Sequence, residues 1–262
     1  MTTLRSSVLK PLTEPNPVEK ARLTMAIDMA APLGADADIA LPTGIPGRPP
    51  LPQLVKATEL KLLSLRTPEG RAGLIHSIVH IELNAIDLAL DIACRFPGLP
   101  EQFYLDWVTI AKEEALHFSL LRDQLRTYGF EYGDFDAHNG LWDMAERTSG
   151  DILARIALVP RTLEARGLDA SPQVKKKLVG AGDRKAGEIL DIILRDEIGH
   201  VAVGNKWYRW LCQQRGLDPI STYAELVKKY EPPKLRQPFN LEARRLAGFD
   251  EAELEALQAQ AS

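Results

Sequence analysis

KEEALHF, at residues 112–118, and RDEIGHV, at residues 195–201, each carry a glutamate three positions before a histidine. Residues three and four apart lie on the same face of an α-helix, so each pair lies on one helical face. The other residues of these two faces are mostly apolar, which predicts that both pairs are buried in a helical core. The pairs are Glu114 with His117 and Glu197 with His200.

Two further glutamates lie in helical stretches without a nearby histidine. Glu82 has apolar residues at the neighbouring positions of its face, whereas Glu164 lies in the less uniform stretch VPRTLEARG. An unpaired buried charge costs several kcal/mol, a large share of the ~5–15 kcal/mol by which a domain is stable. We therefore expect bound cations to neutralise these carboxylates. Arg161 is expected to neutralise Glu164 or, as the less favoured alternative, to contact an anionic substrate.

The spacing of the four glutamates predicts two antiparallel helical hairpins. Glu82 and Glu114 are 32 residues apart and centre on the turn FPGLP, and Glu164 and Glu197 are 33 residues apart and centre near Gly180. A hairpin folded at each centre brings its two carboxylates to the same height. The alternative interpretation is that each Glu-x-x-His is a core pair with a neutral, hydrogen-bonded imidazole.

Helical patterns cover most of the chain, and no run of strand-like alternation is present. Long helices are expected at 68–96, 101–128, 141–166 with a kink at Pro160, and 183–215. GLDASP is expected to break the chain before a short helix that follows Pro172, and further short helices are expected at 17–30 and after the N-caps Asn240 and Asp250. The sequence thus predicts an all-α protein with an N-terminal arm or linker (1–66), a four-helix bundle (67–216) and a C-terminal extension packed on the bundle (217–262).

Carboxylates combined with imidazoles favour iron or manganese, because calcium takes oxygen ligands alone. Two divalent cations would balance the charge of four carboxylates. One Glu from each of two helices, with a Glu-x-x-His from each of two others, is the ligand set of dinuclear carboxylate bundles. We expect two iron ions, with manganese or a mixed pair as alternatives. The expected ligands are Glu82, Glu114, His117, Glu164, Glu197 and His200.

Several stretches between Leu74 and Phe249 resemble the ferritin-like superfamily, and more narrowly a bacterial family of ferritin-like proteins of unknown function. They are HSIVHIELNAIDLALDIACRFPGLP, DWVTIAKEEALHF, YGDFDAHNGLWDMAERT, ALVPRTLEARGLD, ILRDEIGHVAVGNKWYRWLC and PFNLEARRLAGF. The resemblance implies a ferritin-like four-helix bundle and a metal site at the six positions above. It also implies that Asp196, directly before Glu197, holds a ligand histidine in place by a hydrogen bond. Glu113 has the equivalent position directly before Glu114, where several relatives carry aspartate.

The predicted function is an O2-activating di-iron oxidase or oxygenase, an oxidoreductase of the monooxygenase type, with an unidentified organic substrate. Relatives with similar site plans hydroxylate a modified tRNA base, desaturate acyl chains or deformylate aldehydes. They imply a small organic substrate or modified nucleoside, and an electron-donating reductase as partner. The alternatives are iron handling by ferroxidation and storage, and metal binding without turnover. A missing CxxC disfavours a rubrerythrin-type peroxidase, and Leu120 and Leu121 disfavour a tyrosyl-radical ribonucleotide reductase subunit.

Net charge, cysteine spacing and hydropathy limit the expected classes of binding partner and the expected cellular compartment. The 262 residues carry a formal net charge of −4, which disfavours nucleic acid as a partner, with tRNA as the exception. Cys94 and Cys212 form no metal-type spacing and fit a reducing compartment. No apolar run approaches the ~20 residues of a membrane helix, and the N-terminus lacks a signal-peptide pattern. We expect a cytoplasmic monomer or small homo-oligomer without a membrane partner.

Besides the face that carries Glu82, the first long helix (68–96) has polar residues along another face, which we call the second polar stripe. We expect it to be solvated or packed under the N-terminal arm, with a second metal site as the less favoured alternative. His138, in the DAHNG stretch, is expected to be a turn residue rather than a ligand. The stripe comprises His76, His80, Asn84, Asp87 and Asp91.

Overall fold

Helices make up the secondary structure of the computed structural model, which describes residues 2–61 and 63–260. In these residues the only extended pairing is an isolated parallel bridge between Leu54 and Ala137. The chain forms two compact units, Met1–Trp142 and Asp143–Ser262. The all-α class is confirmed, while the ferritin-like bundle and the boundaries at residues 66 and 216 stay predictions.

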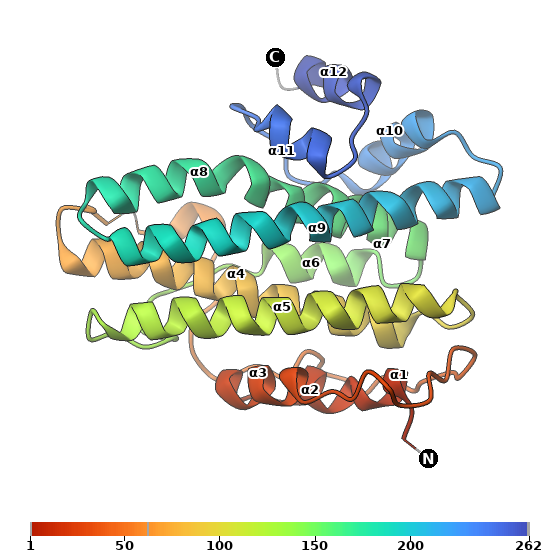
Figure 1. Cartoon of the computed structure of the whole chain (residues 1–262), viewed down its shortest axis with the longest axis horizontal. Coiled ribbons are helices and arrows are strands. Elements are labelled where there is room, and N and C mark those ends of the chain that lie inside the picture. The colour runs from red at the N-terminus through yellow and green to blue at the C-terminus, as the bar shows by residue number, and fades with distance from the viewer. Residues whose placement is uncertain (1, 62, 261–262) are drawn as a thin grey trace. The chain divides into compact units, whose positions relative to one another are not determined.

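The first unit is built on a helical hairpin of α4 (Pro68–Arg95) and α5 (Glu101–Arg126). Thr67 caps α4 by accepting a hydrogen bond from the Gly70 amide at 3.1 Å. Gly98 provides the left-handed backbone (φ 75°) of the FPGLP turn, which lets α5 return beside α4 (Figure 1). Both helices lie within two residues of their predicted bounds, and their facing sides form the apolar core of the unit.

The N-terminal segment packs on α4 and α5 through the short helices α1 (Leu4–Ser7), α2 (Leu9–Thr13) and α3 (Pro17–Met25). Only α3 was predicted, and it ends five residues earlier than expected; η1 (Ala57–Glu59) adds one 3₁₀ turn. Arg5 is buried and donates to the carbonyls of Ala93 and Cys94 at 3.1 and 2.7 Å. It therefore satisfies acceptors that the last turn of α4 leaves open.

The second polar stripe of α4 is packed under this segment, which was one of the predicted alternatives. Lys20 of α3 forms a buried ion pair with Asp87, and Arg48 donates to Asn84 Oδ1 at 3.0 Å. His80 lies between the Tyr132 hydroxyl at 2.8 Å and the His138 carbonyl at 3.0 Å. These contacts fix the segment and the loop after α5 to α4.

His76 and His138 also serve the loop after α5. The Gly133 amide donates to His76 Nε2 at 2.9 Å, and the His76 ring stacks on Tyr132 with centroids 5.2 Å apart. His138 Nδ1 accepts from the Gly140 amide at 3.2 Å, so its ring has a local backbone partner just before α6 begins. Burial lowers the pKa of both His76 and His80 to about 4, so both rings are neutral at physiological pH.

The helix predicted at 141–166 is wrong, because the chain breaks at residues 148–151. α6 (Gly140–Arg147) ends before this break, and α7 (Ile152–Leu158) begins after it. Asp151 caps α7 by accepting from the Leu153 amide at 3.0 Å. Buried Arg155 donates to Thr148 Oγ1 at 3.0 Å and to the carbonyl of Ala145. The break is therefore closed by side chains whose partners the sequence pattern does not reveal.

The predicted break at GLDASP is also wrong. After a π-helical turn at the expected kink, η2 (Val159–Glu164), helix α8 runs unbroken from Ala165 to Gly180 and contains Pro172. A proline inside a helix leaves the carbonyl four residues earlier without its N–H. That carbonyl belongs to Leu168, and it accepts a hydrogen bond from Asn240 Nδ2 at 3.2 Å. A residue far along the chain therefore compensates for the proline.

The rest of the second unit packs against α8 and the long helix α9 (Arg184–Gln214), whose predicted bounds are confirmed to within one residue. It comprises α10 (Pro219–Tyr230), α11 (Leu241–Leu246) and α12 (Glu251–Gln260). Asn240 accepts from the Ala243 amide at 3.2 Å and Asp250 from the Glu253 amide at 2.9 Å, which confirms both predicted N-caps. A core of Ala165, Leu168, Val201, Ala243, Phe249 and Leu254 holds α8, α9, α11 and α12 together.

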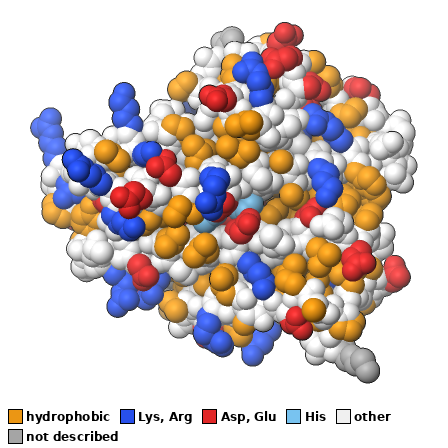
Figure 2. Space-filling model, in the orientation of Figure 1, with side chains coloured by type: hydrophobic (Ala, Val, Ile, Leu, Met, Phe, Trp, Pro, Cys, Tyr) orange, Lys and Arg blue, Asp and Glu red, His pale blue; other side chains and the backbone are white. Residues whose placement is uncertain are grey.

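On the face drawn in Figure 2, acidic and basic side chains are interspersed and no field of one sign dominates. None of the helices in the described ranges has both the length and the apolar character that crossing a bilayer requires.

Asn240→Ala is expected to lower the free energy of unfolding by about 1–3 kcal/mol, because it removes the cap of α11 and the partner of a buried carbonyl. Urea denaturation followed by circular dichroism measures the loss. Asn240→Ser keeps a capping oxygen but no amide donor, so its loss should be smaller. Equal stability of Asn240→Ala and the wild type would contradict this role for Asn240.

The two buried histidines predict acid sensitivity. Between pH 6.5 and 4 these histidines are protonated in the unfolded chain but stay neutral in the folded protein. The free energy of unfolding therefore falls as pH falls through this window. Each ring contributes about 1.4 kcal/mol per pH unit. His80→Gln should therefore show a shallower fall than the wild type by about that slope in urea titrations at pH 6.5, 5.5 and 4.5. Parallel curves for the two proteins would refute the assignment.

Candidate metal centre

The hairpin of the first unit brings three metal-type side chains together. Glu82 comes from α4, and Glu114 and His117 come from α5; each offers a ligand atom within 4.8 Å of the others. His117 Nδ1 lies 3.3 Å from Glu82 Oε2 and 3.3 Å from Glu114 Oε2. All three are at most 3% exposed. The prediction that this hairpin places its two carboxylates at the same height is confirmed.

Apolar neighbours hold this group away from water. On α4, Ile75, Val79 and Ile86 are fully buried around Glu82. On α5, Trp107 and Phe118 are each 1% exposed and lie on the same helical face as Glu114. The predicted apolar stripes are therefore real core faces, and the charged side chains are embedded in them.

Burial and mutual charge shift the protonation of the group. Burial raises the pKa of Glu82, and the neighbouring charge of Glu114 raises that pKa further. Burial alone would lower the pKa of His117, but the hydrogen bonds and charges of Glu114 and Glu82 outweigh it and raise that pKa well above its ordinary value. These contacts favour a charged imidazole at His117 over the neutral imidazole of the alternative interpretation.

The second unit carries the other Glu-x-x-His pair on α9. His200 Nδ1 lies 3.9 Å from Glu197 Oε1, and the two residues are 1% and 8% exposed. Glu164 is half-buried at the last position of η2. One turn later, a Cβ on Gly167 would lie 3.9 Å from the carboxylate carbon of Glu197. The segment that carries Glu164 therefore runs beside Glu197.

Gly167, in the stretch VPRTLEARG, lies close to this pair and was given no role from the sequence. A Cβ at this position would be in ordinary van der Waals contact with the Glu197 carboxylate, so the first turn of α8 passes close to that group.

Arg161 does not act as the predicted counter-charge of Glu164. Its guanidinium donates from Nη2 to Glu253 Oε1 of α12 at 2.5 Å. On a regular helix residues 161 and 164 share a face, but the π-helical turn η2 changes that spacing. The prediction that Arg161 neutralises Glu164 is therefore wrong.

Asp196 and Glu113 directly precede the paired glutamates, as predicted. Asp196 accepts from Arg195 Nε at 2.8 Å and from Arg195 Nη2 at 3.1 Å, and its side chain is 14% exposed. Glu113 is half-buried on α5. Their predicted hydrogen bonds to ligand histidines stay predictions.

The donor group of the first unit fits a metal ion. Glu82 Oε2 is buried and lies 3.3 Å from His117 Nδ1, so two potential ligand atoms already face each other in the core. Carboxylate oxygens and an imidazole nitrogen are donors that iron, manganese and zinc accept. A cation bound here would replace the proton of His117 as the positive charge between the carboxylates. The buried Glu/His group can therefore hold a metal ion, whose identity the donors leave open.

In the metal-free protein, the ring of His117 is expected to be charged at pH 8, while His76 and His80 are neutral at the same pH. The ¹⁵N chemical shifts of the imidazole nitrogens distinguish these forms, and His117→Gln assigns the signal. A neutral His117 ring at pH 8 would contradict the described contacts with Glu82 and Glu114.

Comparison with known proteins places both units in one family. A family model described as "Protein of unknown function (DUF455)" matches residues 13–255. A protein of Haemophilus influenzae named "Uncharacterized protein" is 44% identical over 254 residues, which cover 92% of this chain and 88% of the relative. No solved structure matches the chain. The matched residues include all six predicted ligands.

Proposed function

The chain belongs to the DUF455 family, and we propose that it is a dinuclear metal-carboxylate protein. The donor group of the first unit, Glu82, Glu114 and His117, and that of the second unit, Glu164, Glu197 and His200, would hold the two ions together. The observation that carries this proposal is the buried approach of His117 to two carboxylates on neighbouring helices. Such a group is costly in an apolar core unless a cation binds there.

The two donor groups have the same composition. Each supplies two carboxylates and one imidazole, and each contains one Glu-x-x-His pair on a long helix. Six protein donors are too many for one tetrahedral ion and would suit two ions. Two divalent cations also balance the four carboxylate charges. This composition supports a ferritin-like arrangement of α4, α5, α9 and the α7–η2–α8 segment that carries Glu164, which is part of the proposal.

Within this class we propose an O2-activating oxidase or oxygenase with iron as the native metal. When bound, a pair of ferrous ions supplies two electrons with which O2 can be reduced while an organic substrate is oxidised. The chain's own contribution is to hold the donors in place and to keep water out. Trp107, Ile110 and Phe118 form the apolar surroundings of Glu114 and are at most 4% exposed. An apolar lining of this kind also suits the apolar part of a small organic substrate.

Repeated turnover needs partners that the chain does not provide. The described residues contain no CxxC or other second redox group, because the two cysteines, Cys94 and Cys212, are buried free thiols. Electrons must therefore come from a separate reductase. A small organic molecule or a modified nucleoside is the proposed substrate class.

Metal-free protein titrated anaerobically with Fe(II) is expected to bind two ions per chain, and Glu114→Gln combined with Glu197→Gln should weaken binding by more than the ~10–100-fold typical of supporting residues. Iron per chain, counted after desalting, gives the measurement. The matched control is Glu101→Gln with Glu188→Gln, the same changes at exposed positions of α5 and α9. Two tightly bound ions in the first double variant would refute the proposal.

Excess Fe(II) followed by O2 separates an oxidase from an iron store. The proposed oxidase should retain no more than two iron ions per chain and stay a monomer or small oligomer in light scattering. Retention of many more ions per chain in a large shell would contradict the oxidase and support iron storage. Two retained ions that never react with O2 would leave a metal-binding protein without turnover.

A further inference from the structure

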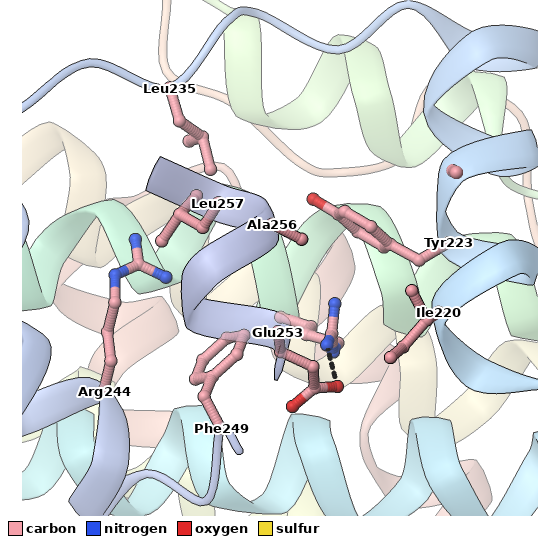
Figure 3. A pocket seen from close by; sticks show the side chains of 10 residues that line it. Ile220, Tyr223, Leu235, Arg244, Phe249, Glu253, Ala256 and Leu257 are labelled. Atoms are coloured by element: carbon pink, nitrogen blue, oxygen red, sulfur yellow. Dashed lines mark hydrogen bonds and ion pairs between the residues drawn. The ribbon is translucent and has the colours of Figure 1, made fainter. Parts of the chain in front are cut away.

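A pocket lies in the second unit, between α10, α12 and the loop that precedes α11 (Figure 3). Ile220 and Tyr223 line one side, and Phe249 and Leu257 line the other. Its volume is about 70 Å³, several times the ~10–15 Å³ that one water molecule needs. A ligand of a few heavy atoms therefore fits, and its lining contains none of the six predicted metal ligands.

Arg161 is the buried charge of this pocket. Its residue is 5% exposed, and its guanidinium lies 4.8, 4.7 and 4.9 Å from the ring centroids of Tyr208, Tyr223 and Phe249. Aromatic faces stabilise a cation but accept no ordinary hydrogen bond. Arg161 Nε is buried and has no hydrogen-bond partner among the described residues. One N–H donor of a buried guanidinium that lines the pocket thus lacks an acceptor among the described residues.

The local charges favour an anion as that acceptor. Glu253 accepts from both Arg161 at 2.5 Å and Arg209 at 2.6 Å, so two guanidiniums share one buried carboxylate. Arg209 is 39% exposed and also has Asp250 at 3.8 Å, so water and Asp250 contribute to its balance. Arg244, the other arginine of the lining, is matched by Asp169 at 2.6 Å. Arg161 therefore shares its buried carboxylate with a second guanidinium, and an anion at its Nε would be a further acceptor.

The rest of the lining is apolar. Leu235, Ala256 and Leu257 face the pocket together with Ile220, which is 44% exposed although it is large and apolar. An aliphatic group in the pocket would cover this surface and gain the free energy of apolar burial. The pocket thus combines the Nε donor of Arg161 with walls that suit a short hydrocarbon chain.

We propose that this pocket binds a small amphiphilic anion, a monocarboxylate with a short aliphatic chain. Its carboxylate accepts from Arg161 and its chain packs between Ile220 and Leu257. The proposal does not rest on the metal centre, because no predicted metal ligand lines the pocket.

Isothermal titration of the metal-free full chain with hexanoate tests the proposal. Hexanoate should bind, whereas hexanol, with the same chain but no charge, and inorganic phosphate, with charge but no chain, should bind at least about tenfold more weakly. Ala256→Trp should fill the pocket and weaken hexanoate binding at least about tenfold. Ala252→Trp places the same side chain at an exposed position of α12 and should bind as the wild type does.

A second variant keeps the test decisive if Ala256→Trp does not fold. Arg161→Lys keeps the charge but removes the Nε donor, and it too should weaken hexanoate binding. No hexanoate binding below ~10 mM, a range weaker than ordinary ligand affinities, would overturn the proposal. So would equal binding of hexanol or phosphate, or unchanged binding in folded Ala256→Trp or Arg161→Lys. Iron counts on the same preparations report on the metal proposal separately.

Discussion

The burial of carboxylates in an apolar helical core is the constraint on which this structure depends. Glu82 and Glu114 come within reach of one imidazole because α4 and α5 return on each other at FPGLP. In water these groups would be solvated; in the core they must share charge or bind a cation. The two carboxyl groups raise the pKa of His117, which favours a positive charge between them, and the same geometry presents two carboxyl groups and an imidazole to a metal.

The sequence revealed the first donor group because its signals were local. Helical spacing placed Glu114 and His117 on one face, and equal distances from the FPGLP turn placed Glu82 opposite them. The caps Asn240 and Asp250 were predictable for the same reason, since each acts on the amides of the next turn. The long helices α4, α5 and α9 carry clear apolar periodicity and were also predicted well.

The errors arose where a distant residue decides a local structure. Pro172 reads as a helix break, but Asn240 supplies the hydrogen bond that the proline cannot. Arg161 has the spacing to neutralise Glu164, but a π-helical turn and Glu253 of α12 give it another partner. The packing of the N-terminal segment could not be predicted for the same reason, because the partners of Arg5 and Lys20 lie on α4, far along the chain. No pattern within a short stretch of sequence contains this information.

Anomalous X-ray scattering at the iron edge, from crystals of the iron-loaded protein, tests the central claim most directly. The account predicts two neighbouring iron peaks, with Glu82, Glu114 and His117 on one side and Glu164, Glu197 and His200 on the other. Iron peaks at the molecular surface, or iron held by only one of the two donor groups, would contradict it.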